Sequence, residues 1–355
     1  MTQRVARKNG WAFVITFVVM LLAAAHSVDA QETSDSSGGY IDDALVRSRI
    51  RFRFDAGFDM NRPDRAEFFY ASWAELTDHQ HAIKNTNQTV NAPHNRGPVI
   101  APQFVNYQDI STYLELNCNE RMSVFCELPF RLVQFHGNLD EENSHLDTGE
   151  SDAFDAAEDA ASRKNLGVSD TQLGFKFAMV NDPNQFLTFQ LRTFIPTGDA
   201  RLGLGTGHFS IENGLLLQQR LSQDFAFMGQ AKLWSPISGG SNAGNIAIYG
   251  AGLSYDAYHH EGFRISPVAE FVGWTVLNGF ETIASPTGAN VVPNGASLES
   301  DHGVQSAAGD TIVNAKLGFR TFLGSGSDVY VGWGHCLTGN RWYQDMLRIE
   351  YRRTF

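Results

Sequence analysis

Large apolar side chains alternate with charged ones along residues 46–60, which read VRSRIRFRFDAGFDM. Ile50 and Phe52 fall on one side of this alternation, and Arg49 and Arg51 fall on the other. A period of two residues is the period of a β-strand. One face of this strand is therefore rich in phenylalanine and the other in arginine, so the two faces require different environments.

Similar alternating segments recur to the end of the chain, separated by short stretches rich in residues that favour turns. With the first they make twelve: 46–60, 111–118, 121–132, 171–179, 186–195, 209–221, 225–234, 245–256, 263–274, 311–322, 328–337 and 346–355.

The connections between these segments alternate in length. Long ones include 61–103, 136–170 and 277–310, and short ones include 119–120 and 222–224. Long and short connections then lie at opposite ends of the strands, which is typical of outer-membrane barrels with long outer loops and short periplasmic turns. The sequence predicts an all-β fold: a closed antiparallel transmembrane β-barrel of about 12 strands over residues 46–355.

The first thirty residues have the layout of a secretory signal. Arg4 and Lys8 precede an apolar run over 11–25, and Val28-Asp29-Ala30 is a typical cleavage site. The run is shorter than the about 20 residues of a membrane-spanning helix, which disfavours a retained anchor. We therefore predict a signal peptide over 1–30, a periplasmic N-terminal segment over 31–45 and an outer-membrane location.

Charge and cysteine content exclude several classes of function. The net charge of −12 disfavours nucleic acid as a partner, because phosphate attracts a basic surface. The cysteines are Cys118, Cys126 and Cys336, an odd number that does not indicate a disulfide framework. Their spacing fits no metal site, and we expect no cofactor.

One face of each strand contacts lipid in this interpretation, and the other lines a lumen too wide for apolar side chains to fill. Basic residues outnumber acidic ones on the inward register, although the whole chain is acidic. The candidate pore-lining residues are Arg47, Arg49, Arg51, Arg53, Arg131, Arg192, Arg220, Arg320, Glu115, Glu127 and Glu270. The arginines either form cross-strand ion pairs or face a water path and attract anions.

Two of the long connections have unusual compositions. Phe68, Phe69, Tyr70 and Trp73 make the loop 61–103 too aromatic for an ordinary solvated loop, so it forms either a constriction inside the lumen or an outer hairpin. The loop 136–170 is strongly acidic and is expected to be a solvated cap, with cation binding or gating as the alternative.

His208 and Ser210 are the best catalytic candidates, because a histidine beside a serine can activate it toward an ester. Outer-membrane lipid esterases need this pair to face lipid, whereas Ser210 falls on the inward register with Glu212. The register therefore disfavours an enzyme. His259 and His260 lie in a predicted short turn and are expected to be solvated.

Residues 195–221 resemble an outer-membrane channel family named for the meta-cleavage pathway of phenol degradation. The resemblance rests on Pro196-Thr197-Gly198-Asp199, which ends one strand, and on Phe209-Ser210, which begins the next. Residues 61–71 and 254–279 are similar to barrel proteins of planctomycete-type bacteria, mostly uncharacterised. Phe355 resembles the terminal aromatic residue by which the barrel-assembly machinery recognises its clients, although Arg353 departs from the usual apolar pattern.

The resemblance implies passive uptake of small, often aromatic compounds through the barrel. The sequence therefore predicts an outer-membrane channel for small solutes, aromatic or anionic ones among them, with membrane lipid and the assembly machinery as partners. The alternatives are an outer-membrane lipid esterase, a closed barrel that binds or anchors, and a soluble secreted barrel.

Overall fold

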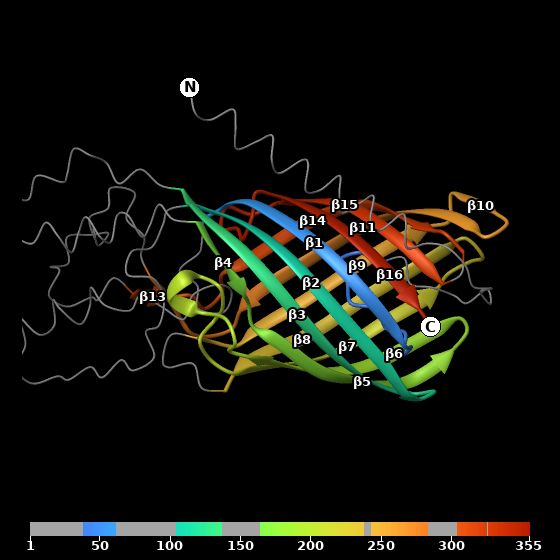
Figure 1. Ribbon diagram of the computed structural model, residues 1–355, viewed down its shortest axis with the longest axis horizontal. Coiled ribbons are helices and arrows are strands. Elements are labelled where there is room, and N and C mark those ends of the chain that lie inside the picture. Colours follow the sequence, from blue (N-terminus) through green and yellow to red (C-terminus); the bar gives the residue numbers. More distant parts are fainter. Residues whose placement is uncertain (1–37, 62–103, 137–163, 238–242, 283–303, 325) are drawn as a thin grey trace, which may run out of the picture.

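The chain folds into one closed antiparallel β-barrel in the computed structural model (Figure 1). The structure describes residues 38–61, 104–136, 164–237, 243–282, 304–324 and 326–355. Its twelve barrel strands are β1 (Arg49–Met60), β2 (Phe104–Asn119), β3 (Met122–His136), β5 (Thr171–Asp182), β6 (Gln185–Ile195), β7 (Ser210–Arg220), β8 (Phe225–Pro236), β9 (Ile246–Tyr255), β11 (Phe263–Val276), β14 (Thr311–Phe322), β15 (Ser327–Cys336) and β16 (Asp345–Thr354).

Four shorter strands lie outside this ring. β4 (Lys164–Val168) pairs with β3, and β10 (Tyr258–His260) pairs with β11. β12 (Phe280–Thr282) and β13 (Val304–Ser306) pair with each other in a separate two-stranded sheet, and η2 (Ala200–Leu202) is a single 3-10 turn. No helix in the described part of the chain is long and apolar enough to cross a membrane.

The first and last strands close the ring. β1 pairs antiparallel with β16, with Phe54 opposite Ile349, and also with β2. Every other barrel strand pairs with its neighbours in chain order. The predicted fold class is thus confirmed, and so is the strand count.

The second strand is longer than its predicted alternating segment, 111–118. The structure starts β2 at Phe104, directly after the predicted loop 61–103. Val105 and Tyr107 point inward there and are buried, so an apolar interior replaces the simple alternation of apolar and charged faces. They belong to an apolar cluster inside the barrel at the end with the long connections: Met60, Val105, Tyr107, Val133, Leu204, Ile312, Cys336, Trp342, Tyr343 and Met346.

The outer surface of the barrel is apolar and its interior carries the charges. Large apolar side chains that are at least two-fifths exposed include Leu128, Phe130, Phe271, Leu317, Phe319, Val331 and Trp333. Arg49, Glu115 and Arg320 are almost fully buried. A water-soluble protein has the opposite distribution, whereas a barrel surrounded by lipid has this one.

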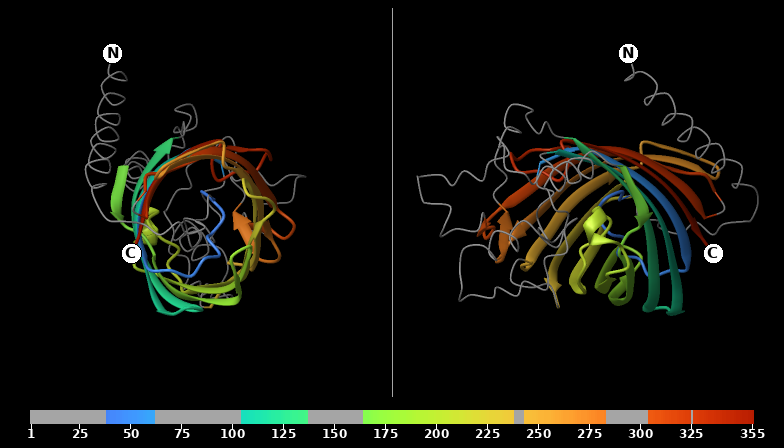
Figure 2. Two further views of the ribbon diagram at one scale, coloured as in Figure 1. Left: turned by 90° about the vertical axis from the view of Figure 1, so that its right-hand side faces the viewer. Right: turned by 60° about the vertical axis from the view of Figure 1, so that its left-hand side comes forward.

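Residues 38–48, which precede β1, lie inside the barrel (Figure 2). We call residues 38–48 the inner segment. The sequence led us to expect a periplasmic segment over 31–45, but the structure differs for residues 38–45. The acids of this segment contact cations of the barrel wall, which explains its position physically. Residues 31–37 lie outside the described part.

Candidate functional site

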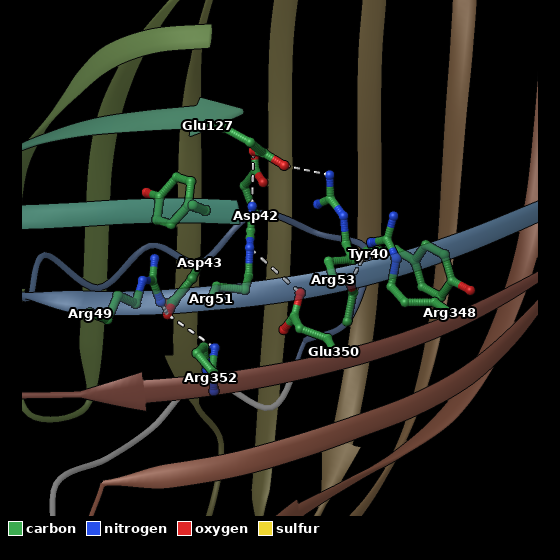
Figure 3. A network of polar contacts seen from close by, with 12 residues as sticks. Tyr40, Asp42, Asp43, Arg49, Arg51, Arg53, Glu127, Arg348, Glu350 and Arg352 are labelled. Atoms are coloured by element: carbon green, nitrogen blue, oxygen red, sulfur yellow. Dashed lines mark hydrogen bonds and ion pairs between the residues drawn. The ribbon is translucent and has the colours of Figure 1, made fainter. Parts of the chain in front are cut away.

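The arginines of β1 are neutralised by acids on the inner wall. Because side chains alternate along the strand, Arg49, Arg51 and Arg53 all point to the lumen. Arg49 pairs with Asp43 of the inner segment, and its Nη2 lies 2.8 Å from Glu115 Oε2. Arg51 Nη2 lies 3.1 Å and Arg53 Nη2 lies 2.7 Å from the carboxylate of Glu127 (Figure 3).

Glu115 on β2 is fully buried and accepts several hydrogen bonds. Ser123 Oγ donates at 2.6 Å and Tyr113 Oη donates at 2.7 Å. Lys176 Nζ on β5 lies 3.2 Å away. Buried charges are tolerated when such partners are present. This favours the ion-pair interpretation of the arginine series in the observed state.

A second group of ion pairs lies where the barrel closes. Arg320 pairs with Asp328, and its Nη2 lies 2.8 Å from Glu350 Oε1. Arg352 Nε lies 2.9 Å from Asp328 Oδ2. Arg348 donates to both carboxylate oxygens of Asp55, at 2.6 and 2.8 Å. Three neighbouring strands, β14, β15 and β16, are thus connected to β1 through charges inside the barrel.

The inner segment contributes two acids to this network. Asp43 contacts Arg49 and lies 3.4 Å from Arg352 Nη1. Asp42 contacts Lys232 and lies 2.9 Å from Arg192 Nη2. Burial acts to raise the pKa of each carboxyl, but the neighbouring cations outweigh it and hold each pKa below its ordinary value. Both acids are therefore charged at neutral pH.

The backbone of the inner segment is also bonded to the wall. The carboxylate of Glu270 on β11 accepts N–H groups from Gly39, Tyr40 and Ile41, at 2.8 to 3.3 Å. Arg348 donates to Gly39 O at 2.6 Å. Figure 3 shows Arg348 beside Tyr40, the next residue of the inner segment.

Three further bonds extend this attachment along the segment. Lys176 Nζ donates to Asp43 O at 2.9 Å, Thr188 donates to Ala44 O, and Arg320 donates to Gly38 O. Wall side chains thus satisfy the backbone of an irregular segment, as burial requires.

Tyr40 places an aromatic ring among cations. Lys316 Nζ lies 3.8 Å and the Arg348 guanidinium carbon 4.1 Å from the ring centroid of Tyr40. The rings of Trp274 and Tyr343 lie 5.4 and 5.7 Å from the same Lys316 Nζ. Aromatic faces attract cations at such distances, so this part of the wall combines positive charge with an aromatic surface.

The remaining predicted pore-lining residues have different surroundings. Arg131 forms a two-bond pair with Asp109, at 2.7 and 2.8 Å. Arg220 is exposed and lies beside a shallow pocket at the end with the short turns. Arg47 is half-buried. The predicted constriction residues Phe68, Phe69, Tyr70 and Trp73 lie outside the described part.

Sequence reasoning missed the acids that complete the network, namely Asp42, Asp43, Asp109 and Asp328. The available signal was the excess of basic residues on the inward register, which called for acids from outside the counted strands. Asp42 and Asp43 stand directly before the arginine-rich strand in the sequence.

The histidine and serine candidates lie inside the barrel wall. His208 and Ser210 are both buried, and Phe209 between them is exposed on the outer side. His208 Nδ1 bonds with Thr206 O at 3.0 Å, and burial lowers the pKa of this histidine. Neither His208 Nε2 nor Ser210 Oγ has a hydrogen-bond partner among the described residues. The two side chains are therefore not bonded to each other as a nucleophile and its base would be.

The one described acid of the loop 136–170 is structural. Asp170 is buried and accepts hydrogen bonds from the backbone N–H of Gly198 and Thr206, at 3.1 and 2.8 Å. It therefore fixes the connection between β6 and β7, and the expectation of a solvated cap does not apply to it. The other acids of this loop lie outside the described part.

The cysteines and the two neighbouring histidines of β10 were also considered as candidate metal ligands or site residues. Among the residues that the structure describes, no three histidine, cysteine, aspartate or glutamate side chains are grouped to hold a metal ion. Cys118, Cys126 and Cys336 are free thiols. His259 and His260 are exposed in β10.

Solved structures of several outer-membrane proteins are similar to this chain in fold. No family model and no curated protein matches the sequence. An outer membrane channel from Pseudomonas putida F1 is 14% identical with a TM-score of 0.49, over 90% of this chain and 100% of that one. The NanC porin is 7% identical, with a TM-score of 0.41, over 87% and 98% of the chains.

A monoaromatic hydrocarbon channel, CymD, is 9% identical with a TM-score of 0.37, over 88% of this chain and 89% of that one. At these identities the likeness concerns the fold alone. The resemblances to the phenol-pathway channels and to the planctomycete-type barrels stay predictions. By its fold, the chain is a closed, twelve-stranded antiparallel β-barrel.

Proposed function

We propose that the protein is an outer-membrane β-barrel channel for small solutes, and that the inner segment occupies its lumen in the resting state. The distribution of side chains supports a membrane location, because apolar groups cover the outside and charges line the inside. The signal layout of residues 1–30 agrees with this location.

The way in which the inner segment is attached supports the proposal that it closes the channel in the resting state. Residues 38–45 of the inner segment are held by hydrogen bonds and ion pairs to side chains of the wall and by apolar packing of Ile41, and no described residue pairs with them as a strand. The wall cations are paired with acids in this state, so we do not expect the β1 arginines to act as an open anion filter. Solute passage requires the segment to move away from the wall.

Small anionic or aromatic solutes are the class that the inner wall would accept. Cations and aromatic rings face the inner segment around Tyr40, as described above. Such a surface attracts anions by charge and aromatic rings by cation–π contact. The resemblance to the phenol-pathway channels points to the same class.

Recording from the refolded full chain in planar bilayers tests the proposal. We expect rare, short openings in the wild type and frequent openings in a D42N/D43N variant, because that variant loses the segment's attachment to Arg192, Lys232, Arg49 and Arg352. We expect anion preference in the open state, reduced in R49A/R51A. A folded wild type and a folded D42N/D43N variant that both lack current would contradict a channel.

A closed barrel that binds or anchors is the second candidate, and a specific observation favours it. The apolar cluster around Trp342 and Tyr343 fills the interior near the long connections, beyond the inner segment. If this cluster blocks passage, releasing the segment will produce no current. The recordings above therefore distinguish the two candidates.

An esterase is disfavoured by the inward, unbonded His208 and Ser210. We expect a fluorophosphonate probe to leave Ser210 unlabelled in the folded protein. Labelling that disappears in S210A would instead support the enzyme.

A further inference from the structure

The carboxylate of Asp42 lies in a ready-made cluster of donors on the inner wall. Arg192 Nη2 lies 2.9 Å and Gln190 Nε2 lies 3.1 Å from Asp42 Oδ2. Lys232 Nζ donates to the same oxygen. Arg192 and Gln190 belong to β6 and Lys232 belongs to β8. Side chains from β6 and β8, the two strands on either side of β7, thus donate hydrogen bonds to one acid.

The wall holds these donors in place independently of Asp42. Glu212 on β7 lies between them, with its Oε1 3.3 Å from Arg192 Nη1 and 3.3 Å from Lys232 Nζ. Without Asp42, Glu212 would be the one carboxylate of the described residues in contact with both buried cations. An unpaired buried charge is costly, so the cluster favours a second anion.

Asp42 uses only part of the donor capacity of the cluster. Each bond described above ends on Oδ2 of its carboxylate. The Nε–H of Arg192 is buried and finds no acceptor in the described part of the chain. Arginine binds a carboxylate most strongly through two parallel hydrogen bonds. A free carboxylate, unlike Asp42, is not restrained by a backbone and can turn to use both Nε and Nη2.

We propose that Arg192, Lys232 and Gln190 form a binding site for the carboxylate of a small organic acid, which Asp42 occupies in this structure. Asp42 acts as an internal substitute for the solute and leaves the site when the inner segment moves. The proposal names a solute class for the proposed channel and rests on that function for its biological meaning. The binding site itself can be tested without any current.

Asp42 is better suited to exchange than its neighbour in the segment. The side chain of Asp42 is 17% exposed, whereas that of Asp43 is 7% exposed. Asp43 also connects Arg49 of β1 with Arg352 of β16, where the barrel closes. Replacing Asp43 would therefore also remove contacts of Arg49 and Arg352, whereas replacing Asp42 leaves the contacts of β1 and β16 in place.

Chemical rescue of the full mature chain in detergent micelles tests the site. D42A should melt at a lower temperature than wild type. Lactate should restore much of the difference in a saturable way, while chloride at equal ionic strength should not. Wild type should gain little from lactate, because Asp42 fills the site. An equal response of D42A to lactate and chloride would overturn the proposal.

The double variant D42A/R192M is the matched control, and D42A/K232M replaces it if the first fails to fold. Either should lose the rescue by lactate. Rescue of the same size in a folded double variant would also overturn the proposal, because the anion would then bind elsewhere.

Bilayer recording separates this proposal from the channel function. D42A should have a higher permeability ratio of lactate to chloride than D42A/R192M. Rescue by lactate without current in any variant would contradict the channel and support the binding site. Current without rescue, and with equal permeability ratios in the two variants, would support the channel and contradict the binding site.

Discussion

Gly39 lies directly against the ring of Tyr330. A Cβ atom at position 39 would come within 2.1 Å of Tyr330 Cζ, far closer than any real contact. Tyr330 cannot retreat, because it is fully buried on the wall and its hydroxyl lies over Gly318 and Gly332. Only glycine at position 39 lets the inner segment approach the wall this closely.

Gly39→Ala should therefore displace the inner segment. We expect a loss of about 1 to 3 kcal/mol of stability from the clash and more frequent channel openings in planar bilayers. Gly339→Ala is the matched control, because a Cβ there meets nothing within 4 Å and should change neither property. Unchanged stability and gating in G39A would show that the segment does not lie against Tyr330.

Glu270→Gln should loosen the backbone attachment of the inner segment. The substitution replaces a charged acceptor of three N–H groups by an amide, and charge-assisted bonds are about twice as strong as neutral ones. Hydrogen exchange of the amides of residues 39–41, followed by mass spectrometry, should accelerate by about tenfold or more. Glu120→Gln, in an exposed turn, should leave this exchange slow. Equal protection in E270Q would refute the role of Glu270.

Acid should release the inner segment only at low pH. The cations around Asp42 and Asp43 hold the pKa of each carboxyl below its ordinary value, about 3.9 in a free chain. The contribution of both acids is then complete above about pH 4 and is lost as the pH falls further toward the lowered pKa values.

Openings in bilayers should therefore be equally rare at pH 6.5 and pH 5, and become frequent below about pH 4. In D42N/D43N this step should be absent. The cations that contact these acids or their backbone are Arg192, Lys232, Arg49, Arg352 and Lys176. A step centred near pH 6 would point to a different titrating group.

Phe271→Arg should impair folding into a bilayer. Phe271 is 56% exposed on the outer surface of β11, near the middle of the strand. A charged side chain at the bilayer midplane costs about 2 to 4 kcal/mol in such barrels. Urea titration of protein folded into lipid vesicles measures this cost. His259→Arg, in the exposed turn strand β10, is the control and should be nearly neutral. No loss in F271R would place this surface outside the membrane.

The barrel was predictable from the sequence because each strand is recognisable from the alternation of its own residues. Alternation of Phe52 and Leu114 with charged neighbours defines each strand and its two faces, and the lengths of the connections define the order of the strands. The inward position of Arg49, Glu115 and Ser210 follows from the same period. Residues 104–110 lie between the predicted loop 61–103 and the predicted segment 111–118. Their inward face carries Val105 and Tyr107 as well as Asp109, so the alternation of apolar and charged faces is lost there.

The position of the inner segment could not be derived in this way. Asp43 contacts Arg352, and Tyr40 contacts Glu270, although most of the sequence separates the two residues of each pair. The sequence shows only that the strands carry more inward cations than acids.

The sequence by itself determined the barrel, its apolar outer side and its charged interior, because a two-residue period acts strand by strand. The tertiary structure alone decided which acids neutralise the arginines and that residues 38–48 lie within the lumen. Closing the sheet brings distant strands around one small volume, where each buried charge must find a partner.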